Sequence, residues 1–109
     1  MKVPNCENAF VAPEKIETYL MNPDHPDGGS KARFFLQVGF DNDTLESALK
    51  QKILENIFAV SITNLFGTKY VVEAQIESPS GFSFNLRSVW VILSGSLHPI
   101  LITAYPLKK

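Results

Sequence analysis

The sequence has little of several things that would narrow its function quickly. It contains a single cysteine, Cys6, among 109 residues, so no disulfide can form within the chain, which fits a reducing compartment. Ten basic and eleven acidic side chains give a net charge of −1. A protein that binds nucleic acid non-specifically is usually strongly basic, because each phosphate contact needs a cation. Any contact with nucleic acid must therefore depend on a local group of cations.

Long apolar runs are also missing. No stretch of the sequence approaches the roughly 20 apolar residues that span a bilayer. The first residues carry Pro4, Asn5, Glu7 and Asn8 where a signal peptide needs an apolar segment. We therefore expect a cytoplasmic protein with no membrane partner.

The strong catalytic and metal-binding motifs are absent from the sequence as well. It has no phosphate-binding glycine loop, no G-x-S-x-G motif and no C-x-x-C pair. The two histidines, His25 and His98, stand far apart, whereas zinc sites gather several ligands at short spacing. We expect neither a metal nor another cofactor.

What the first half does contain is a series of helix signals. A helix is predicted over residues 13–21, because Pro13 suits the first position of a helix and Pro23 ends one. The apolar side of this helix is formed by Ile16, Tyr19 and Leu20. Residues 22–30, with two prolines and two glycines, form a loop. Ser30 is then expected to cap a second helix over residues 31–38, with Gly39 at its C-terminal end.

A third helix is predicted for residues 44–56. Apolar side chains recur there with the helical period. Asp43 is expected at the N-cap, and Glu46 follows at capping-box spacing. Glu46 and Lys50 stand four residues apart, in the favourable order for an ion pair.

The second half alternates apolar and polar residues, as half-buried strands do. The strands are expected at residues 58–66, 69–77, 82–93 and 99–105. The third is apolar on both faces after Ser88, which predicts a central strand that is covered on both sides. The last is expected to alternate regularly, with Leu101, Thr103 and Tyr105 on one face.

The helices come first and the strands follow, and short turns connect the strands. This order predicts an α+β fold. About three N-terminal helices should pack on one face of a four-stranded antiparallel sheet that runs as a meander. Hydrophobic residues make up 45% and charged residues 19% of the chain, a balance typical of a folded domain rather than a disordered segment. We expect a single domain over residues 1–109.

Polar residues that this fold brings together are candidates for chemistry. His25 lies in the loop and Lys31 in the first turn of the second helix, whereas Arg87, Thr103 and Tyr105 lie on two neighbouring strands. Metal-independent cleavage of RNA needs a base for the 2′-hydroxyl, an acid for the leaving oxygen and fixed cations at the charged phosphorane. An arginine fork matches phosphate geometry. His25 or Lys31 can transfer protons, and Tyr105 can donate one.

Each candidate also has a purely structural interpretation. His25 can bond a backbone carbonyl in its loop, and Lys31 can be an exposed lysine at a position that the helix dipole makes mildly unfavourable. Arg87 can pair with Glu73 or Glu77 across the strands. The two candidates on the last strand are ordinary strand formers.

Four segments carry a resemblance to a known family. They are P-E-K-I-E-T-Y-L-M-N-P-D-H-P-D-G-G-S-K-A-R-F-F from Pro13, L-F-G-T-K-Y-V-V from Leu65, S-V-W-V-I-L from Ser88 and I-T-A-Y-P from Ile102. The most specific parts are H-P…K-A-R-F-F in the first segment and T-A-Y-P in the last. In order, the four segments resemble a family of small, uncharacterised bacterial domains over nearly the whole chain. These domains occur free-standing, as C-terminal modules of phage head-morphogenesis proteins, and in polymorphic toxins. The family is similar in turn to the barnase–EndoU–colicin–RelE-like ribonucleases.

The resemblance implies a ribonuclease-like site. The residues that it implies for this site are Lys31, Arg87, Thr103, Tyr105 and His25. The family pattern has a histidine directly before the lysine, where this chain has Ser30. If that histidine carries the proton, this copy is either impaired or uses His25 instead. Free-standing members resemble toxins that a small neighbouring protein inhibits, so RNA and a small antitoxin-like protein are the implied partners.

Two other functions stay open. A non-enzymatic interaction module would dock a partner protein through its sheet, and would expose an apolar patch around Phe66, Tyr70 or Val71. The near-neutral charge favours this function. A small-molecule binder would instead need a cavity between the helices and the sheet.

Overall fold

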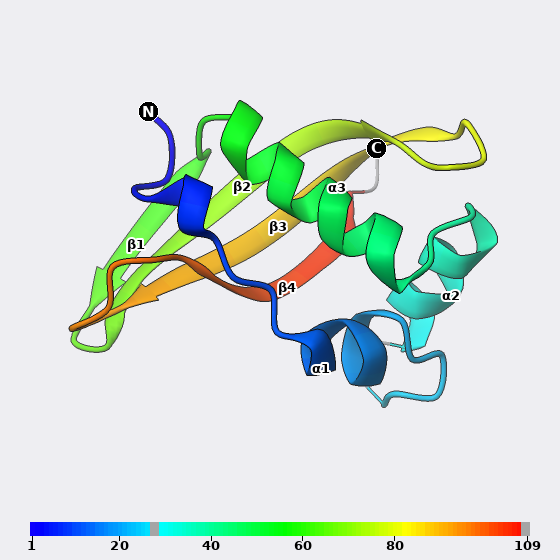
Figure 1. Cartoon of the computed structure of the whole chain (residues 1–109), viewed down its shortest axis with the longest axis horizontal. Coiled ribbons are helices and arrows are strands. Elements are labelled where there is room, and N and C mark those ends of the chain that lie inside the picture. The colour runs from blue at the N-terminus through cyan, green and yellow to red at the C-terminus, as the bar shows by residue number, and fades with distance from the viewer. Residues whose placement is uncertain (27–28, 108–109) are drawn as a thin grey trace.

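The computed structural model describes residues 1–26 and 29–107. Asp27 and Gly28 of the expected loop lie outside these described residues. The helical segments come first along the chain and the strands follow (Figure 1). The prediction of an α+β fold with N-terminal helices and a four-stranded antiparallel sheet is confirmed.

The first predicted helix is present, but it changes type along its length. After the short 3-10 turn η1 (Cys6–Asn8), α1 spans Pro13–Lys15 and continues into the π-helical segment η2 (Ile16–Leu20). Together α1 and η2 cover nearly all of the range 13–21. None of the helices in the described part of the chain is long and apolar enough to cross a membrane.

The second helix, α2 (Gly29–Gln37), begins two residues earlier than expected. Ser30 therefore lies inside its first turn and does not cap it. At the other end, Gly39 has a φ of 98°, and the Phe40 N–H donates to the Phe35 carbonyl over 3.0 Å. A glycine in this conformation ends a helix, because it tolerates positive φ without a steric cost. The role predicted for Gly39 is confirmed.

The third helix, α3 (Asn42–Glu55), is capped by Asp41 and not by Asp43. The Asp41 carboxylate accepts a hydrogen bond from the Thr44 backbone N–H over 2.8 Å, and the Thr44 hydroxyl accepts one from the Asp41 N–H over 2.9 Å. This is a capping box in which threonine takes the place of the expected glutamate. Hydrogen bonds from the Thr44 backbone and hydroxyl lower the pKa of the Asp41 carboxyl.

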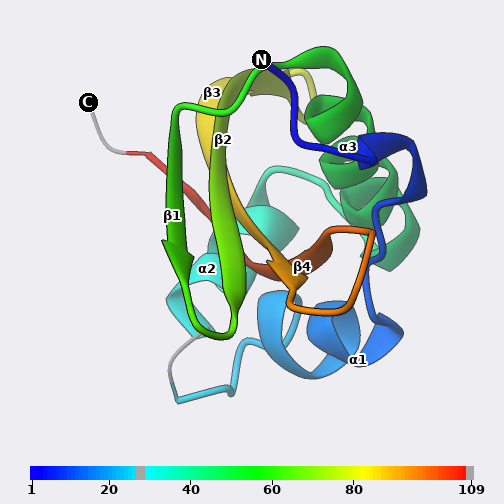
Figure 2. The ribbon, with the colours of Figure 1, turned by 90° about the vertical axis from the view of Figure 1, so that its left-hand side faces the viewer.

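The four strands form one antiparallel meander in the order β1-β2-β3-β4, as predicted. Their bounds are Val60–Asn64 for β1, Gly67–Glu77 for β2, Ser83–Leu93 for β3 and Ile100–Pro106 for β4. The helix α3 lies across one face of this sheet, and α1 lies on the side of β4 (Figures 1 and 2). This face and the helices enclose the core. Trp90 at the centre of β3 is fully buried, and its indole N–H donates to Ser88 Oγ over 2.9 Å.

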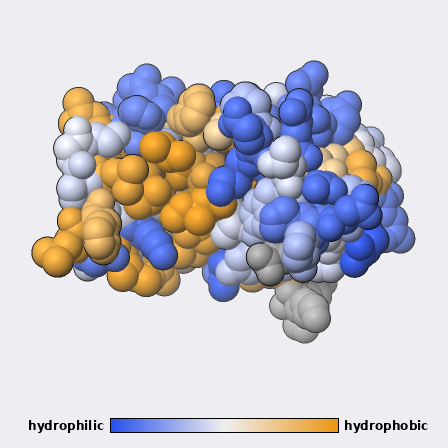
Figure 3. All heavy atoms as spheres, turned by 90° about the horizontal axis from the view of Figure 1, so that it is seen from below, coloured by the Kyte–Doolittle hydropathy of each residue, from blue (hydrophilic) through white to orange (hydrophobic). Residues whose placement is uncertain are grey.

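The other face of β3 is not covered, and the prediction of a strand buried on both sides is wrong. Val89 and Val91 are only half-buried, and Leu93 is 44% exposed. Figure 3 shows hydrophobic side chains gathered over the half of the molecule that carries the β1–β2 and β3–β4 turns, whereas the other half is mainly hydrophilic. The exposed apolar residues of β1 and its turn are Val60, Ile62, Leu65 and Phe66. This face stays open because the described helices pack against the opposite face and along β4.

A β-bulge lies between β3 and β4. Val89 pairs with Thr103, but the next residue of β3, Trp90, pairs with Leu101. Ile102 is therefore an extra residue of β4 that has no partner of its own on β3. Bulges of this kind change which side chains point to which face of a sheet.

The bulge corrects the predicted alternation of β4. Leu101 and Ala104 are both buried in the core, although strict alternation would place them on opposite faces. Thr103 and Tyr105 lie on the outer face, opposite Val89 and Arg87. The expectation that Leu101 shares a face with Thr103 and Tyr105 is therefore wrong.

Candidate functional site

Polar side chains from four elements meet where η2 and α2 reach β4. Lys31 Nζ donates hydrogen bonds to the Tyr19 hydroxyl over 2.7 Å and to the Thr103 hydroxyl over 3.4 Å. The two hydroxyls are 3.0 Å apart and also hydrogen-bond to each other. These three side chains form a closed triangle of polar contacts.

The ring of Tyr105 extends this group towards β3. Lys31 Nζ lies 5.5 Å from the ring centroid, and the guanidinium carbon of Arg87 lies 5.6 Å from it. Arg87 Nη1 also donates to the Tyr105 hydroxyl over 3.1 Å. Two cations thus approach one aromatic ring, whose electron-rich face attracts positive charge. We call the set Tyr19, Lys31, Arg87, Thr103 and Tyr105 the polar cluster.

The backbone explains how distant parts of the chain supply this cluster. The register of β3 and β4 pairs Arg87 with Tyr105 directly, and the bulge keeps Thr103 on the same outer face. These three residues therefore share one face of the sheet. Lys31 reaches them from the first turn of α2, where the helix dipole disfavours a cation. Its contacts with two hydroxyls and two rings offset that small cost.

Arg87 also makes the ordinary ion pair that the sequence allows. Its Nε donates to Glu73 Oε2 over 2.8 Å, and its Nη2 forms an ion pair with the same oxygen. Hydrogen bonds to the Tyr105 hydroxyl and to Glu73 raise the pKa of Arg87. Both partners of the ion pair are partly exposed, and such pairs are weak because water screens their charges. The ion pair therefore adds little to the stability of the fold.

Tyr19 is the member of the cluster that the sequence did not reveal. It was assigned only to the apolar side of the first helix, and its spacing there gives no sign of a polar role. Burial raises the pKa of its hydroxyl, but the hydrogen bonds from Lys31 and Thr103 and the charges of Lys31 and Lys15 outweigh this effect. The pKa of Tyr19 is therefore lowered from its ordinary value.

Tyr19 should consequently lose its proton at a lower pH than an ordinary tyrosine, which titrates near about 10. The difference in ultraviolet absorbance between the wild type and Tyr19→Phe isolates this transition from those of the other two tyrosines. In Lys31→Met the pKa of Tyr19 should rise, because burial is then opposed only by Thr103 and Lys15. A titration midpoint that stays unchanged in Lys31→Met would contradict the role of the ammonium group.

An open pocket of about 450 Å³ lies against the cluster. It is lined by Lys15, Tyr19, His25, Ile102 and Thr103. The His25 ring meets the Tyr19 ring edge-on, with 4.9 Å between the centroids, and Lys15 Nζ lies 5.6 Å from the Tyr19 centroid. The structure therefore brings all five candidate residues from the sequence into one connected region, and His25 joins it through Tyr19.

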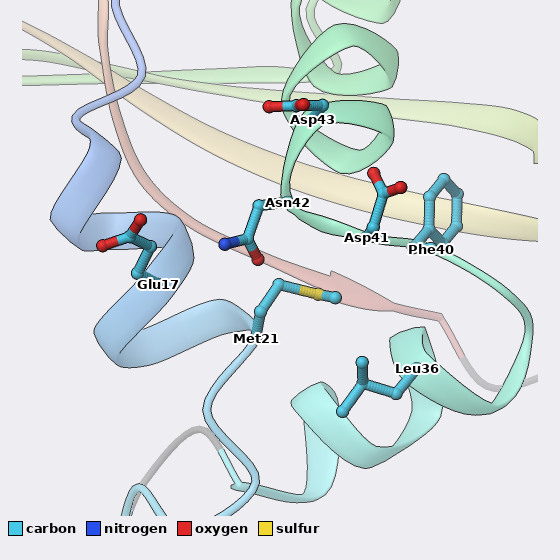
Figure 4. A pocket seen from close by; sticks show the side chains of 7 residues that line it. All are labelled: Glu17, Met21, Leu36, Phe40, Asp41, Asn42 and Asp43. Carbon is cyan, nitrogen blue, oxygen red and sulfur yellow. The ribbon is translucent and has the colours of Figure 1, made fainter.

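A second open pocket, of about 500 Å³, lies between η2, α2 and the start of α3 (Figure 4). Three carboxylates line it, those of Glu17, Asp41 and Asp43, and none of its other lining residues is a cation. Like charges repel, so this surface disfavours a phosphate. The polar cluster, with its lysine and arginine, is better suited to an anion than this acidic pocket is.

Comparison with solved structures identifies the fold. One similar chain comes from a structure described as "Contact-dependent growth inhibition toxin - immunity protein complex from Klebsiella pneumoniae 342". The match has a TM-score of 0.75 and covers 96% of this chain and 98% of that chain, at 17% sequence identity. At such low identity the likeness shows a shared fold and no more. No curated protein matches the sequence.

The sequence also matches the model of a protein family whose function is unknown. A family model described as "Domain of unknown function (DUF6883)" matches residues 2–108, almost the whole chain. The occurrence of such domains in phage proteins and polymorphic toxins, and the likeness to ribonucleases, stay predictions. From the extent of this match, the chain belongs to the DUF6883 family of domains of unknown function.

Proposed function

We propose that this domain cleaves RNA without a metal ion, in the cytoplasm, as the toxin of a toxin–antitoxin pair. The observation that carries the proposal is the approach of Lys31 and Arg87 to the single ring of Tyr105, beside the paired hydroxyls of Tyr19 and Thr103. Fixed cations next to groups that exchange protons are what cleavage of a phosphate ester needs.

The chemistry can be assigned to named side chains. The 2′-oxygen attacks phosphorus and the bond from phosphorus to the 5′-oxygen breaks, which leaves a 2′,3′-cyclic phosphate and a 5′-hydroxyl. His25 takes the proton of the 2′-hydroxyl, since histidine is the most frequent proton carrier in enzymes. Tyr19 gives a proton to the 5′-oxygen, because Lys31 stabilises the phenolate that remains.

The two cations act on the charge that develops during this step. Lys31 and Arg87 hold the non-bridging oxygens of the phosphorane, where a guanidinium fork can donate two parallel hydrogen bonds. Tyr105 accepts a hydrogen bond from Arg87 and so orients it. His25 in this scheme replaces the histidine that the family pattern has at the position of Ser30.

The proposed protein partner is a small inhibitor. The similar solved structure is described as a complex of a toxin with an immunity protein. This chain exposes large apolar residues in the turn between β1 and β2, among them Leu65 at 92% and Phe66 at 77%. Contiguous apolar surface of this kind is typical of places where another protein docks.

The same surface supports a second candidate function, a non-enzymatic interaction module. The sequence predicts an apolar patch around Phe66, Tyr70 or Val71. Phe66 is exposed, whereas Tyr70 and Val71 are half-buried. A module of this kind would bind its partner through this exposed apolar surface and would leave RNA intact.

One assay separates the two functions. Purified protein is incubated in molar excess with mixed RNAs in the presence of EDTA, and the products are analysed for 2′,3′-cyclic phosphate ends. We expect cleavage in the wild type and its loss in Arg87→Ala, with circular dichroism unchanged. RNA that stays intact would leave the interaction module as the function. Cleavage that EDTA abolishes would contradict the metal-independent mechanism.

Lys50→Ala is the matched control for the charge of the protein. Lys50 lies on α3 and pairs with Glu46 at 3.1 Å, as the sequence predicts, and neither residue belongs to the polar cluster. Its removal should leave cleavage unchanged. A similar loss in this control would show that the overall charge, and not the cluster, controls the reaction.

A further inference from the structure

A pocket with aromatic walls lies where β3 extends past the end of β4. Phe34 of α2 and two residues near the start of β3, Phe82 and Phe84, form its walls. The remaining lining residues are Ser83, Asn85, Pro106 and Leu107. Its volume of about 500 Å³ lies within the range of small-molecule sites, about 300–1,000 Å³.

The rings of this pocket present both edges and an open face. Phe34 meets Phe84 edge-on with 5.0 Å between the ring centroids, and Phe82 stacks on Phe84 at 6.1 Å with 23° between the planes. Phe82 is 51% exposed, so much of its ring surface is free of protein contacts. A flat aromatic ligand can therefore stack on its free surface.

The rim of the pocket adds hydrogen-bonding groups. Ser83 and Asn85 line it, and both are exposed. An amide and a hydroxyl can each donate and accept hydrogen bonds. Apolar rings beside a few polar groups match a planar heterocycle with a polar edge, which is the chemistry of a nucleobase.

The pocket adjoins the polar cluster on two elements, α2 and β3. Phe34 follows Lys31 by three residues on α2, a spacing that puts their Cβ atoms about 5–6 Å apart on one side of the helix. Asn85 and Arg87 lie on the same outer face of β3, about 7 Å apart along the strand. A phosphate bound by the two cations would thus have Phe34 and Asn85, two lining residues of the aromatic pocket, as near neighbours.

We infer that this aromatic pocket binds an unstacked base of single-stranded RNA, next to the phosphate that the polar cluster cleaves. The inference rests on the proposed function and extends it to the substrate class. A base in a duplex is stacked on its neighbours and cannot enter the pocket. The substrate is therefore a single strand or a loop, and not a continuous duplex.

The test measures binding without cleavage. A fluorescent, single-stranded 2′-O-methyl oligonucleotide has no free 2′-hydroxyl and cannot be cut by the proposed reaction. We expect Phe82→Ala to weaken its binding by roughly 10-fold to 100-fold, the usual effect of removing one stacking side chain. The slope of affinity against salt should stay unchanged in Phe82→Ala, because that slope counts phosphate contacts. In Lys31→Met the slope should fall.

Phe10→Ala is the matched control, since Phe10 is also a half-exposed phenylalanine, at 47%, but lies before α1, where its backbone N–H donates to the Pro99 carbonyl. It should bind like the wild type. Equal affinity of Phe82→Ala and wild type, no binding by the wild type, or equal binding of a duplex of the same sequence would each overturn the inference.

The two proposals fail in different ways. A single strand that binds in a Phe82-dependent manner to a protein that leaves ordinary RNA intact would keep the base pocket and remove the nuclease. Cleavage of RNA with no effect of Phe82→Ala on binding would keep the nuclease and remove the pocket.

Discussion

Replacing Lys31 by methionine will lower the single-turnover rate of RNA cleavage by about two to three orders of magnitude, the usual cost of removing one preorganised donor from developing charge. Lys31 contacts Tyr19 and Thr103 directly and lies over the ring of Tyr105. Methionine keeps the length and apolar stem of the side chain and removes only the charge and its hydrogen bonds. The proton supplied by Tyr19 also becomes harder to release.

The measurement compares wild type, Lys31→Met and Lys50→Met at saturating protein concentration. Lys50→Met should cleave at the rate of the wild type, because Lys50 belongs to a surface ion pair on α3. Thermal unfolding of the three proteins shows whether the fold is kept. A rate for Lys31→Met within a few-fold of wild type would remove Lys31 from the mechanism.

Trp90→Ala will destabilise the protein by about 3–5 kcal/mol, the range for deleting a large aromatic side chain from a core. Trp90 has no exposed surface, and it pairs with Tyr70 of β2 and Leu101 of β4 at the centre of the sheet. Domains of this size have a total stability of about 5–15 kcal/mol, so the variant loses a large part of it and will unfold at a clearly lower temperature than the wild type. Its loss also leaves Ser88 Oγ without the indole hydrogen bond.

Urea denaturation of Trp90→Ala and Leu97→Ala checks this expectation. Leu97 is 77% exposed, so its truncation should change the free energy of unfolding by less than about 0.5 kcal/mol. A loss of less than about 1 kcal/mol in Trp90→Ala would show that the cavity is refilled and that Trp90 does not anchor the core.

The fold could be predicted because its local signals agree with each other. Alternation through Tyr70, Val72, Ala74 and Ile76 marks the inner face of β2, and the tight turns that follow leave an antiparallel meander as the simple arrangement. The cap of α3 was misplaced because Asp41 and Asp43 both precede polar residues at capping distance. Only the backbone conformation at Asp41 decides between them.

The open face of the sheet could not be read from its residues. A run such as Val89, Val91 and Leu93 is apolar whether a helix of the same chain or another molecule covers it. The sequence predicts that such a surface is buried, but it carries no signal that tells which molecule buries it.

Most of the candidate site followed from residue chemistry and strand order. Thr103 and Tyr105 could be placed on one face by counting along their strand, and Lys31 in a helix near the sheet. The register that sets Arg87 opposite Tyr105 is known only from the structure. Tyr19 could not be found from the sequence, because its ring packs against the core while its hydroxyl bonds to the polar cluster. Its role depends on the π-helical turn of η2 and on the reach of Lys31, which only coordinates reveal.

The extra residue of β4 has a consequence for how this small sheet can vary. In a regular strand, successive side chains alternate between the two faces, so the face of one residue fixes the face of every other. Ile102 shifts that alternation by one residue, so Leu101 before it and Ala104 after it both fill the core, while Thr103 and Tyr105 face outwards. Deleting this one residue would restore strict alternation, and one half of β4 would then turn its core side chains towards the solvent.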